Sequence, residues 1–412
     1  MYRNIETANV ALAERFDVMS LPTEFYENPY PIYHALRRYA PVHKMSSGTW
    51  FLTRHNDLTE IYKDPTLFSS DKTVDFRKTM GTTALYEHHT ASLVFNDPPR
   101  HSRVRKRLAP AFTPRALRTL TKRVEAVVDQ TIDVVGAMGE FDLLHDFAMK
   151  LPIELIGDML GVPSNDRHKL SPWAVEILGG LEADLNTEKL QRGATAVDEF
   201  KEYLGWLIAE RKTNSATNDT GEVLSQLIGP DKDGAELSEL ELLHNCIFLL
   251  NAGHETTANT ITNGIDVLLR FPHELDRLRS APDMIVSATE EILRFESAVQ
   301  LNNRKLTADA VVGGIQMDEG DYLWLAIGAA NRDPQKFMKP DEFDIGRSPN
   351  RHFAFGTGIH ACAGMSLARM EVQIAINKLI QRFGSIEQKG RSMRQQRARF
   401  RGFDKYFVCV ST

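Results

Sequence analysis

The strongest helical pattern in the sequence runs from about residue 238 to residue 270. It opens with Ser238 and Glu241, an S-x-x-E capping box in which each side chain satisfies a free amide of the first turn. Apolar or small residues then recur at helical spacing, at Leu240, Leu243, Ile247, Leu250, Ala258, Ile261, Ile265 and Leu268. A helix of this length extends about 50 Å at ~1.5 Å per residue. The pattern therefore predicts a central helix that crosses a whole domain.

The rest of the chain also favours helices over strands. Thr113 and Pro114 cap a helix predicted over 114–135, while strand signals are confined to segments near 41–54 and 305–325. Residues 69–96 and 211–222 are polar and poorly periodic, so they are expected to be loops. The alternating pattern of a parallel α/β sheet is absent from the sequence. We predict one domain over residues 1–412, mainly α with small peripheral β-sheets.

Charge and cysteine content exclude several classes of protein. The 49 basic and 55 acidic side chains give a net charge of −6, which provides no argument for nucleic-acid binding. The three cysteines cannot form a disulfide framework, which fits a reducing compartment. The first twenty residues contain no apolar run long enough for a signal peptide or a membrane anchor. We expect a cytoplasmic protein with no membrane anchor.

The most informative short segment is Phe355–Gly364, with the sequence FGTGIHACAG. Its glycines, which include Gly356 and Gly364, surround Cys362 just before a predicted helix. Backbone amides and the helix dipole stabilise a thiolate at such a position, and glycines let the backbone approach a flat ligand closely. The segment predicts a cysteine thiolate that ligates iron.

This segment has other possible interpretations. Residues 356–361 superficially match a dinucleotide motif, but no βαβ pattern surrounds them and no acidic residue lies near position 381. A nucleophilic pair of Cys362 with His360 is possible on sequence alone. From this segment by itself, a buried structural cysteine in a tight turn is as good an interpretation as an iron ligand.

Two further motifs carry polar residues. Inside the long helix stands Ala252–Thr257, where Gly253 and Thr256 are expected to loosen the helix and form a polar groove. A zinc-protease interpretation fails because Ala258 stands where the second histidine is required. An ordinary polar helix face is the alternative. Glu291 and Arg294 form an i, i+3 pair, which alone indicates little.

Taken together, these motifs resemble the cytochrome P-450 family of haem-thiolate monooxygenases. The resemblance covers nearly the whole chain in the right order, through F-G-x-G-x-H-x-C-x-G, A-G-x-E-T-T and E-x-x-R. Further matches lie at 97–105, 112–114, 304–309 and 343–347. The resemblance implies the cytochrome P-450 fold, with the long helix at about 238–270 lying over the haem.

The resemblance also implies roles for single residues. Cys362 would be the axial thiolate of haem b iron, and Phe355 would pack near its sulfur. Four basic residues would neutralise the haem propionates: His101, Arg105, Arg304 and His360. Other positions expected to contact haem are Gly356, Gly364, Ala252 and Gly253. Thr256 and Glu255 would form the proton-delivery groove, and Glu291 with Arg294 would be a structural pair. Cys246 and Cys409 match no ligand position and are expected to be buried packing residues.

The implied function is a monooxygenase that uses dioxygen to oxidise a small to medium, mostly apolar organic substrate. The expected substrate pocket contains Leu249, Asn251, Val299, Leu301 and Asn302, with both asparagines as potential polar anchors. Electrons would come from a separate ferredoxin and its reductase, docked on a basic patch of Arg103, Lys106, Arg107, Arg115 and Arg118. The alternatives are a peroxide-driven peroxygenase and a non-catalytic haem-binding or sensing protein.

The sequence departs from the family pattern at three places. Ser297-Ala298 stands where a proline often precedes Val299. Glu342 occupies the position of an arginine that often joins the glutamate–arginine pair, so a weaker structural triad is expected. Asn251 is polar where an apolar side chain is usual.

Overall fold

The computed structural model describes residues 2–213, 223–230, 234 and 236–411. Its helices in the first half of the chain are α1 Tyr2–Glu14, α2 Thr23–Glu27, α3 Tyr30–Tyr39, α4 His55–Lys63, α5 Thr73–Met80, α6 Ala84–Ala91, α7 Arg100–Leu108, α8 Pro114–Met138, α9 Lys150–Leu160, α10 Leu170–Gly179 and α11 Thr187–Thr213. The later helices are α12 Val223–Ile228, α13 Glu239–Arg270, α14 Pro272–Ser280, α15 Ile285–Phe295, α16 Ile327–Ala330 and α17 Met365–Arg382.

The strands are short and belong to small sheets. They are β1 Val42–Lys44, β2 Trp50–Leu52, β3 Phe68–Ser69, β4 Glu140–Asp142, β5 Leu301–Leu306, β6 Ala310–Val312, β7 Ile315–Met317, β8 Tyr322–Ala326, β9 Ser385–Gln388, β10 Met393–Arg394, β11 Phe403–Lys405 and β12 Phe407–Ser411. The largest sheet has the order β1-β2-β8-β5-β3, in which β2 and β8 are parallel and the other pairs antiparallel. The mainly α prediction with small peripheral sheets is confirmed.

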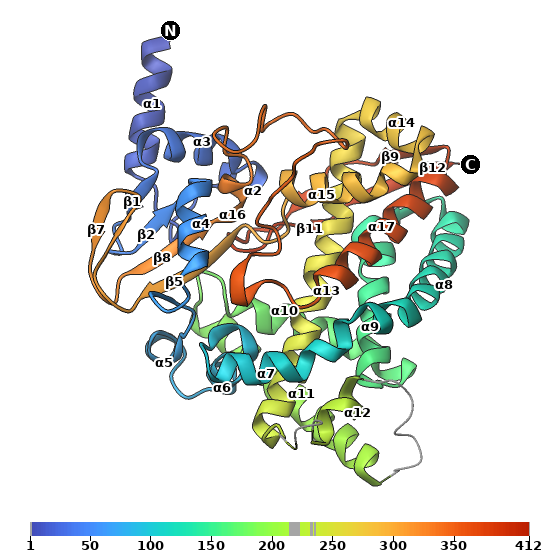
Figure 1. Cartoon of the computed structure of the whole chain (residues 1–412). Helices are drawn as coiled ribbons and strands as arrows, with labels where there is room; N and C mark the ends of the chain where they lie inside the picture. The colour runs from blue at the N-terminus through green and yellow to red at the C-terminus, as the bar shows by residue number, and fades with distance from the viewer. Residues whose placement is uncertain (1, 214–222, 231–233, 235, 412) are drawn as a thin grey trace.

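Helix α13 is the central element that the sequence predicted. Ser238 Oγ accepts from the Glu241 amide at 3.2 Å, and the Ser238 amide donates to Glu241 Oε2 at 3.0 Å, so both halves of the capping box form. The helix packs against α6, α9, α10, α11, α15 and α17. In Figure 1, α13 lies in the interior, between the β-rich part on the left and the helices α8, α9 and α14 on the right. Side chains from neighbouring elements therefore meet along its length.

Two expectations about individual segments need correction. The segment 69–96 is not a loop, since it contains α5, α6 and a short helix over Leu93–Phe95. Its many polar side chains obscured the helical spacing of the apolar residues in the sequence. Buried residues of these helices, such as Leu85 and Met80, pack on the core. Cys409 is exposed on β12, whereas Cys246 is buried as expected. Of the predicted loop at 211–222, residues 214–222 lie outside the described residues.

Candidate active site

The segment Phe355–Gly364 forms a tight loop that leads into α17. The Cys362 amide donates to the Phe355 carbonyl at 2.9 Å, and the Gly356 amide donates to the Phe353 carbonyl at 2.8 Å. Gly358 has a φ of 72°, and a Cβ at this position would lie 2.7 Å from the Tyr62 carbonyl oxygen. The backbone therefore passes too close to α4 for any other residue. This turn presents Cys362 to the interior.

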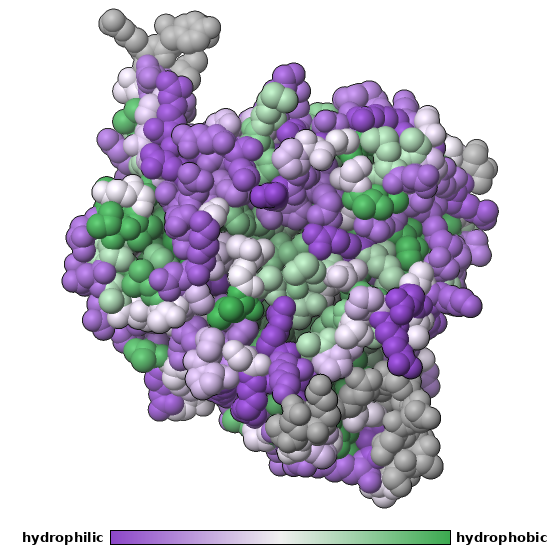
Figure 2. Space-filling view, in the orientation of Figure 1, coloured by the Kyte–Doolittle hydropathy of each residue, from purple (hydrophilic) through white to green (hydrophobic). Residues whose placement is uncertain are grey.

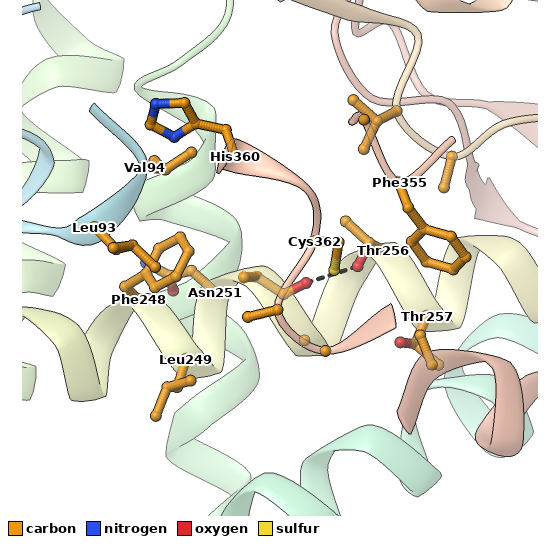
Figure 3. Close-up of a pocket in the computed structure, with 18 of the residues that line it drawn as sticks. Leu93, Val94, Phe248, Leu249, Asn251, Thr256, Thr257, Phe355, His360 and Cys362 are labelled. Atoms are coloured by element: carbon orange, nitrogen blue, oxygen red, sulfur yellow. Dashed lines mark hydrogen bonds between the residues drawn. The ribbon is translucent and has the colours of Figure 1, made fainter. Parts of the chain in front are cut away.

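Cys362 faces the middle of α13 across a cavity of about 310 Å³. In Figure 3, the loop that carries Cys362 approaches the turn of α13 that carries Thr256, with Phe355 and Thr257 at one end and Asn251 and Phe248 at the other. Burial raises the pKa of the Cys362 thiol, while the Gly364 amide and the guanidinium groups of Arg105 and Arg369 lower it. A thiolate here is stable when a further positive charge, such as a metal ion, is bound to the sulfur.

The cavity brings together most of the side chains that the sequence singled out. Those that line it are His101, Arg105, Leu249, Asn251, Ala252, Gly253, Thr256, Val299, Leu301, Asn302, Phe355, Gly356, His360, Cys362 and Gly364. Glu255 and Arg304 do not line it. Arg304 lies behind the wall, with its guanidinium carbon 5.2 Å from the centre of the Tyr62 ring. Neither Cys246 nor Cys409 lines the cavity.

Basic side chains with unused hydrogen-bonding atoms gather at one edge of this cavity. The rings of His101 and His360 lie 4.2 Å apart between centroids. Both ring nitrogens of His101 and Nε2 of His360 are buried without a hydrogen-bond partner among the described residues. Burial and the nearby Arg304, His101 and Arg105 lower the pKa of His360 to about 3. The cluster therefore has donors to spare and an excess of potential positive charge, which suits a ligand with carboxylate groups.

Helix α13 supplies a hydroxyl to the opposite side of the cavity. Thr256 Oγ1 donates to the Ala252 carbonyl at 2.7 Å, one turn earlier. Gly253 leaves room for α9, since a Cβ there would lie 3.0 Å from Ile156 Cδ1. The helix stays continuous from Glu239 to Arg270. The sequence led us to expect a loosened helix at this point. The structure shows only the Thr256 side-chain hydrogen bond and the lack of a side chain at Gly253, within a continuous helix.

Glu255 points away from the cavity into an ion-pair cluster. Its Oε1 contacts Nη1 of Arg397, whose Nε donates to Glu182 Oε1 at 3.0 Å. Burial raises the pKa of Glu255, and Arg397 lowers it. Arg397 and Glu182 were missed from the sequence, although arginines at 394, 397, 399 and 401 are unusually dense for an acidic chain.

A second arginine, Arg347, joins the pair of Glu291 and Arg294, although the family resemblance did not assign it to this pair. Arg294 donates to Glu291 from Nε and Nη2 at 2.8 and 2.7 Å, and Arg347 Nε lies 3.0 and 3.1 Å from the two Glu291 oxygens. The Glu342 side chain instead pairs with exposed Lys339, and its carbonyl accepts from Arg347 Nη2 at 2.8 Å. The expectation of a weakened triad is therefore wrong, because Arg347 supplies the second guanidinium from five residues further along.

The expected basic patch is smaller than the sequence suggested. Arg103 is bound to Glu241, and Arg107 is buried and donates to the Leu227 carbonyl at 3.2 Å. Lys106 on α7 and Arg115 and Arg118 at the start of α8 are exposed. Hydrophilic side chains cover most of the face shown in Figure 2, around a central hollow with green and white residues.

Comparisons with known proteins give the family. The model of the family "Cytochrome P450" matches residues 182–403. Biotin biosynthesis cytochrome P450 of Bacillus subtilis (strain 168) is 36% identical over 375 residues, which cover 88% of this chain and 91% of that protein. Vitamin D(3) 25-hydroxylase of Pseudonocardia autotrophica is 35% identical over 362 residues, with 86% of each chain covered.

Solved structures agree with the sequence relatives. The structure titled P450BioI in complex with hexadec-9Z-enoic acid ligated Acyl Carrier Protein is 34% identical, with a TM-score of 0.89 over 94% of this chain and all of that one. The structure of CalO2 is 29% identical, with a TM-score of 0.88 over 97% of this chain and 99% of that one.

Fold and cavity thus define an α-helical enzyme that holds a flat, carboxylate-bearing group against a cysteine. The chain belongs to the cytochrome P450 family, and it is a haem-dependent monooxygenase of the bacterial type. The family holds haem through an axial cysteine thiolate, and the orphaned histidine nitrogens and the inward-facing cysteine fit that group. Among the described residues, no helix is long and apolar enough to cross a membrane.

Proposed function

We propose that Cys362 is the axial ligand of haem b, with Phe355 beside the sulfur and Ala252, Gly253, Gly356 and Gly364 against the haem. The observation that carries this assignment is the position of Cys362. It lines the cavity opposite α13, whereas the other two cysteines do not. The Soret band of the reduced carbon-monoxide complex in the wild type and in Cys362→His tests it.

The propionates would bind the basic cluster of His101, Arg105, Arg304 and His360. Two carboxylates buried in the protein need paired donors, and His101 and His360, with buried ring nitrogens that have no hydrogen-bond partner among the described residues, would each donate one N–H. Lys72 is also buried and basic, but it does not line the cavity: its Nζ lies 4.6 Å from the centre of the Tyr322 ring, and burial, followed by Arg304, lowers its pKa to about 7.

Bound haem supplies the activation of dioxygen, and its thiolate ligand favours cleavage of the O–O bond. The protein must then deliver protons to the oxygen side of the cavity. Thr256 Oγ1 is placed for this task because it lines the cavity and its proton is held by a neutral carbonyl, from which it can turn away. Glu255 would pass protons to this point after leaving Arg397. The presence of this acid–threonine pair favours the monooxygenase over a peroxide-driven peroxygenase.

Electrons must come from redox partners, and we propose a ferredoxin with its reductase. The sequence has three cysteines, so it cannot provide the four thiolates of a ferredoxin-type cluster itself. The proposed docking surface is the exposed remainder of the patch, Lys106, Arg115 and Arg118, which would attract an acidic protein.

Charge reversal tests the docking surface. Arg115→Glu together with Arg118→Glu should slow reduction of the haem by an acidic ferredoxin several-fold at low salt, with a smaller effect at high salt. Arg382→Glu, at the far end of α17, is the matched control. Equal reduction rates for both variants at every salt concentration would exclude this surface.

The substrate is proposed to be a small to medium, mostly apolar molecule. Leu249, Val299 and Leu301 line the cavity, and Val299 pairs with Phe400 across a β-bridge. The names of the relatives mention biotin biosynthesis and vitamin D(3), so they do not single out one substrate class. A cytoplasmic location and a single domain over residues 1–412 remain proposals, the first supported by three cysteines that form no disulfide.

A further inference from the structure

A second group of polar atoms without partners among the described residues lines the same cavity, on elements other than α7 and the cysteine loop, which carry His101 and His360. His88 and His89 come from α6, and Asn251 comes from α13. All three line the cavity, and each is only 2% exposed. In Figure 3, Asn251 lies at the end of the cavity next to Phe248 and Leu93. The haem and propionate contacts proposed above use none of these three side chains.

The three side chains form one connected group. Asn251 Nδ2 lies 3.4 Å from His88 Nε2, and the rings of His88 and His89 are 5.0 Å apart. Asn251 Oδ1, His88 Nδ1 and His89 Nε2 are buried with no hydrogen-bond partner among the described residues. A buried polar atom left without a hydrogen bond is unfavourable. A bound molecule that satisfies them would therefore be favoured.

His88 packs against His244, which is hydrogen-bonded to an ion pair of Glu87 and Lys201. The His88 ring packs 5.5 Å from the ring of His244, and His244 Nε2 lies 2.9 Å from Glu87 Oε1. Glu87 in turn accepts from Lys201 Nζ at 2.5 Å. The histidine of α6 is thus fixed before any ligand arrives, as a recognition site requires.

The hydrogen-bonding pattern indicates which ligand fits. Burial lowers the pKa of His88 and that of His89, the latter to about 3, so both rings are neutral. His89 bonds the Ile177 backbone, which leaves its Nε2 as an acceptor. Because His88 Nε2 accepts from Asn251, His88 Nδ1 carries the proton and donates. The group therefore offers one donor and two acceptors.

We propose that His88, His89 and Asn251 form a subsite for a hydroxyl group on an otherwise apolar substrate. This inference rests on the proposed function, because it places the substrate in the haem cavity. A hydroxyl both donates to Asn251 Oδ1 or His89 Nε2 and accepts from His88 Nδ1. An ether or a ketone can only accept a hydrogen bond, so it would leave Asn251 Oδ1 and His89 Nε2 unsatisfied. An ionised carboxylate would be repelled by the lone pairs of these two acceptors, and the neutral histidine rings carry no positive charge to offset that repulsion.

Asn302, the other expected polar anchor, is already satisfied. Its Nδ2 donates to the Tyr62 hydroxyl at 3.3 Å, and its Oδ1 accepts from the Asn303 amide at 2.8 Å. Arg399 also lines the cavity and is the rival anchor for a carboxylate. Its Nε, however, is engaged by the Leu181 carbonyl at 3.0 Å.

Spectral titration of the haem-loaded protein tests the subsite. The probes are primary alcohols of about 8–14 carbons, their methyl ethers and the matching carboxylic acids. At the best-fitting length, the alcohol should bind about tenfold more tightly than its ether or acid. Asn251→Leu and His88→Phe should abolish this preference, because each weakens binding of the alcohol more than binding of the ether. His88→Gln, which keeps a donor and an acceptor, should retain part of it.

The matched control is Thr260→Val on the same helix. Thr260 lines the cavity, but its hydroxyl already donates to the Thr256 carbonyl at 2.7 Å, so the preference should persist. The subsite is overturned if alcohol and ether bind equally, if the acid binds best, if no probe shifts the spectrum, or if the preference survives in both apolar variants. Failure of the proposed function would instead appear in the wild type as a reduced carbon-monoxide complex without the thiolate Soret band. The same band in each variant shows that it has folded.

Discussion

The buried carboxylate of Glu291 provides the sharpest test of how the fold is held around the cysteine loop. It is 0% exposed and receives bonds from Arg294, from Arg347, from the Asp344 amide at 3.1 Å and from Asn350 Nδ2 at 3.0 Å. Glu291→Gln removes the negative charge and leaves the fully buried Arg294 without its counter-charge. Removal of one partner of a buried ion pair costs about 3–5 kcal/mol. Glutamine keeps one acceptor oxygen, so we expect the free energy of unfolding to fall by about 3 kcal/mol, the lower end of that range.

Urea unfolding of the haem-loaded protein, followed by circular dichroism, measures this loss. The control is Glu60→Gln, which breaks an exposed i, i+3 pair with Lys63 of 2.7 Å and should cost less than about 1 kcal/mol. Arg347→Leu should also destabilise strongly, whereas Glu342→Ala should not, because the Glu342 side chain reaches only Lys339. If Glu291→Gln costs no more than Glu60→Gln, the argument from burial is wrong.

Three further changes concern the chemistry. Thr256→Ala should keep haem and substrate binding but divert reducing equivalents to hydrogen peroxide, whereas Thr260→Val should not; full coupling of electrons to product in Thr256→Ala would contradict the proton role. Glu255→Gln should slow turnover without changing substrate affinity, because the side chain lies outside the cavity; an unchanged rate rules out the relay. His101→Phe should raise the dissociation constant for haem by about tenfold or more, since hydrogen bonds to charged groups contribute about 1.5–3 kcal/mol. Haem transfer to apomyoglobin measures this constant, and an unaltered value would remove His101 from the propionate site.

Features set by neighbouring residues in the sequence could be predicted closely. The capping box of Ser238 and Glu241 forms with both expected bonds, and α13 ends at Arg270 as the apolar spacing indicated. The turn around Cys362 likewise follows from glycines within a few residues of it. In these cases neighbouring residues form the hydrogen bonds that shape the element, although the close approach of Gly358 to Tyr62 depends on a distant residue.

Features that depend on distant partners could not be predicted. Arg347 meets Glu291 across 56 positions and Arg397 meets Glu255 across 142 positions, and no local pattern reports such pairs. The family resemblance placed the second arginine of the triad at position 342. A motif gives a position in the chain, but it does not show that a side chain five residues later reaches the same carboxylate. Similarly, α6 looked like a loop because its histidines are polar, and only the fold shows them buried.

The central claim is that Cys362 holds the haem iron, and the reduced carbon-monoxide spectrum tests it most directly. The wild type should show the red-shifted Soret band of a thiolate-ligated haem, and so should Cys246→Ala and Cys409→Ala. Cys362→His should lose both this band and monooxygenase activity. A normal thiolate band in Cys362→His, or its loss in either control variant, would contradict the account.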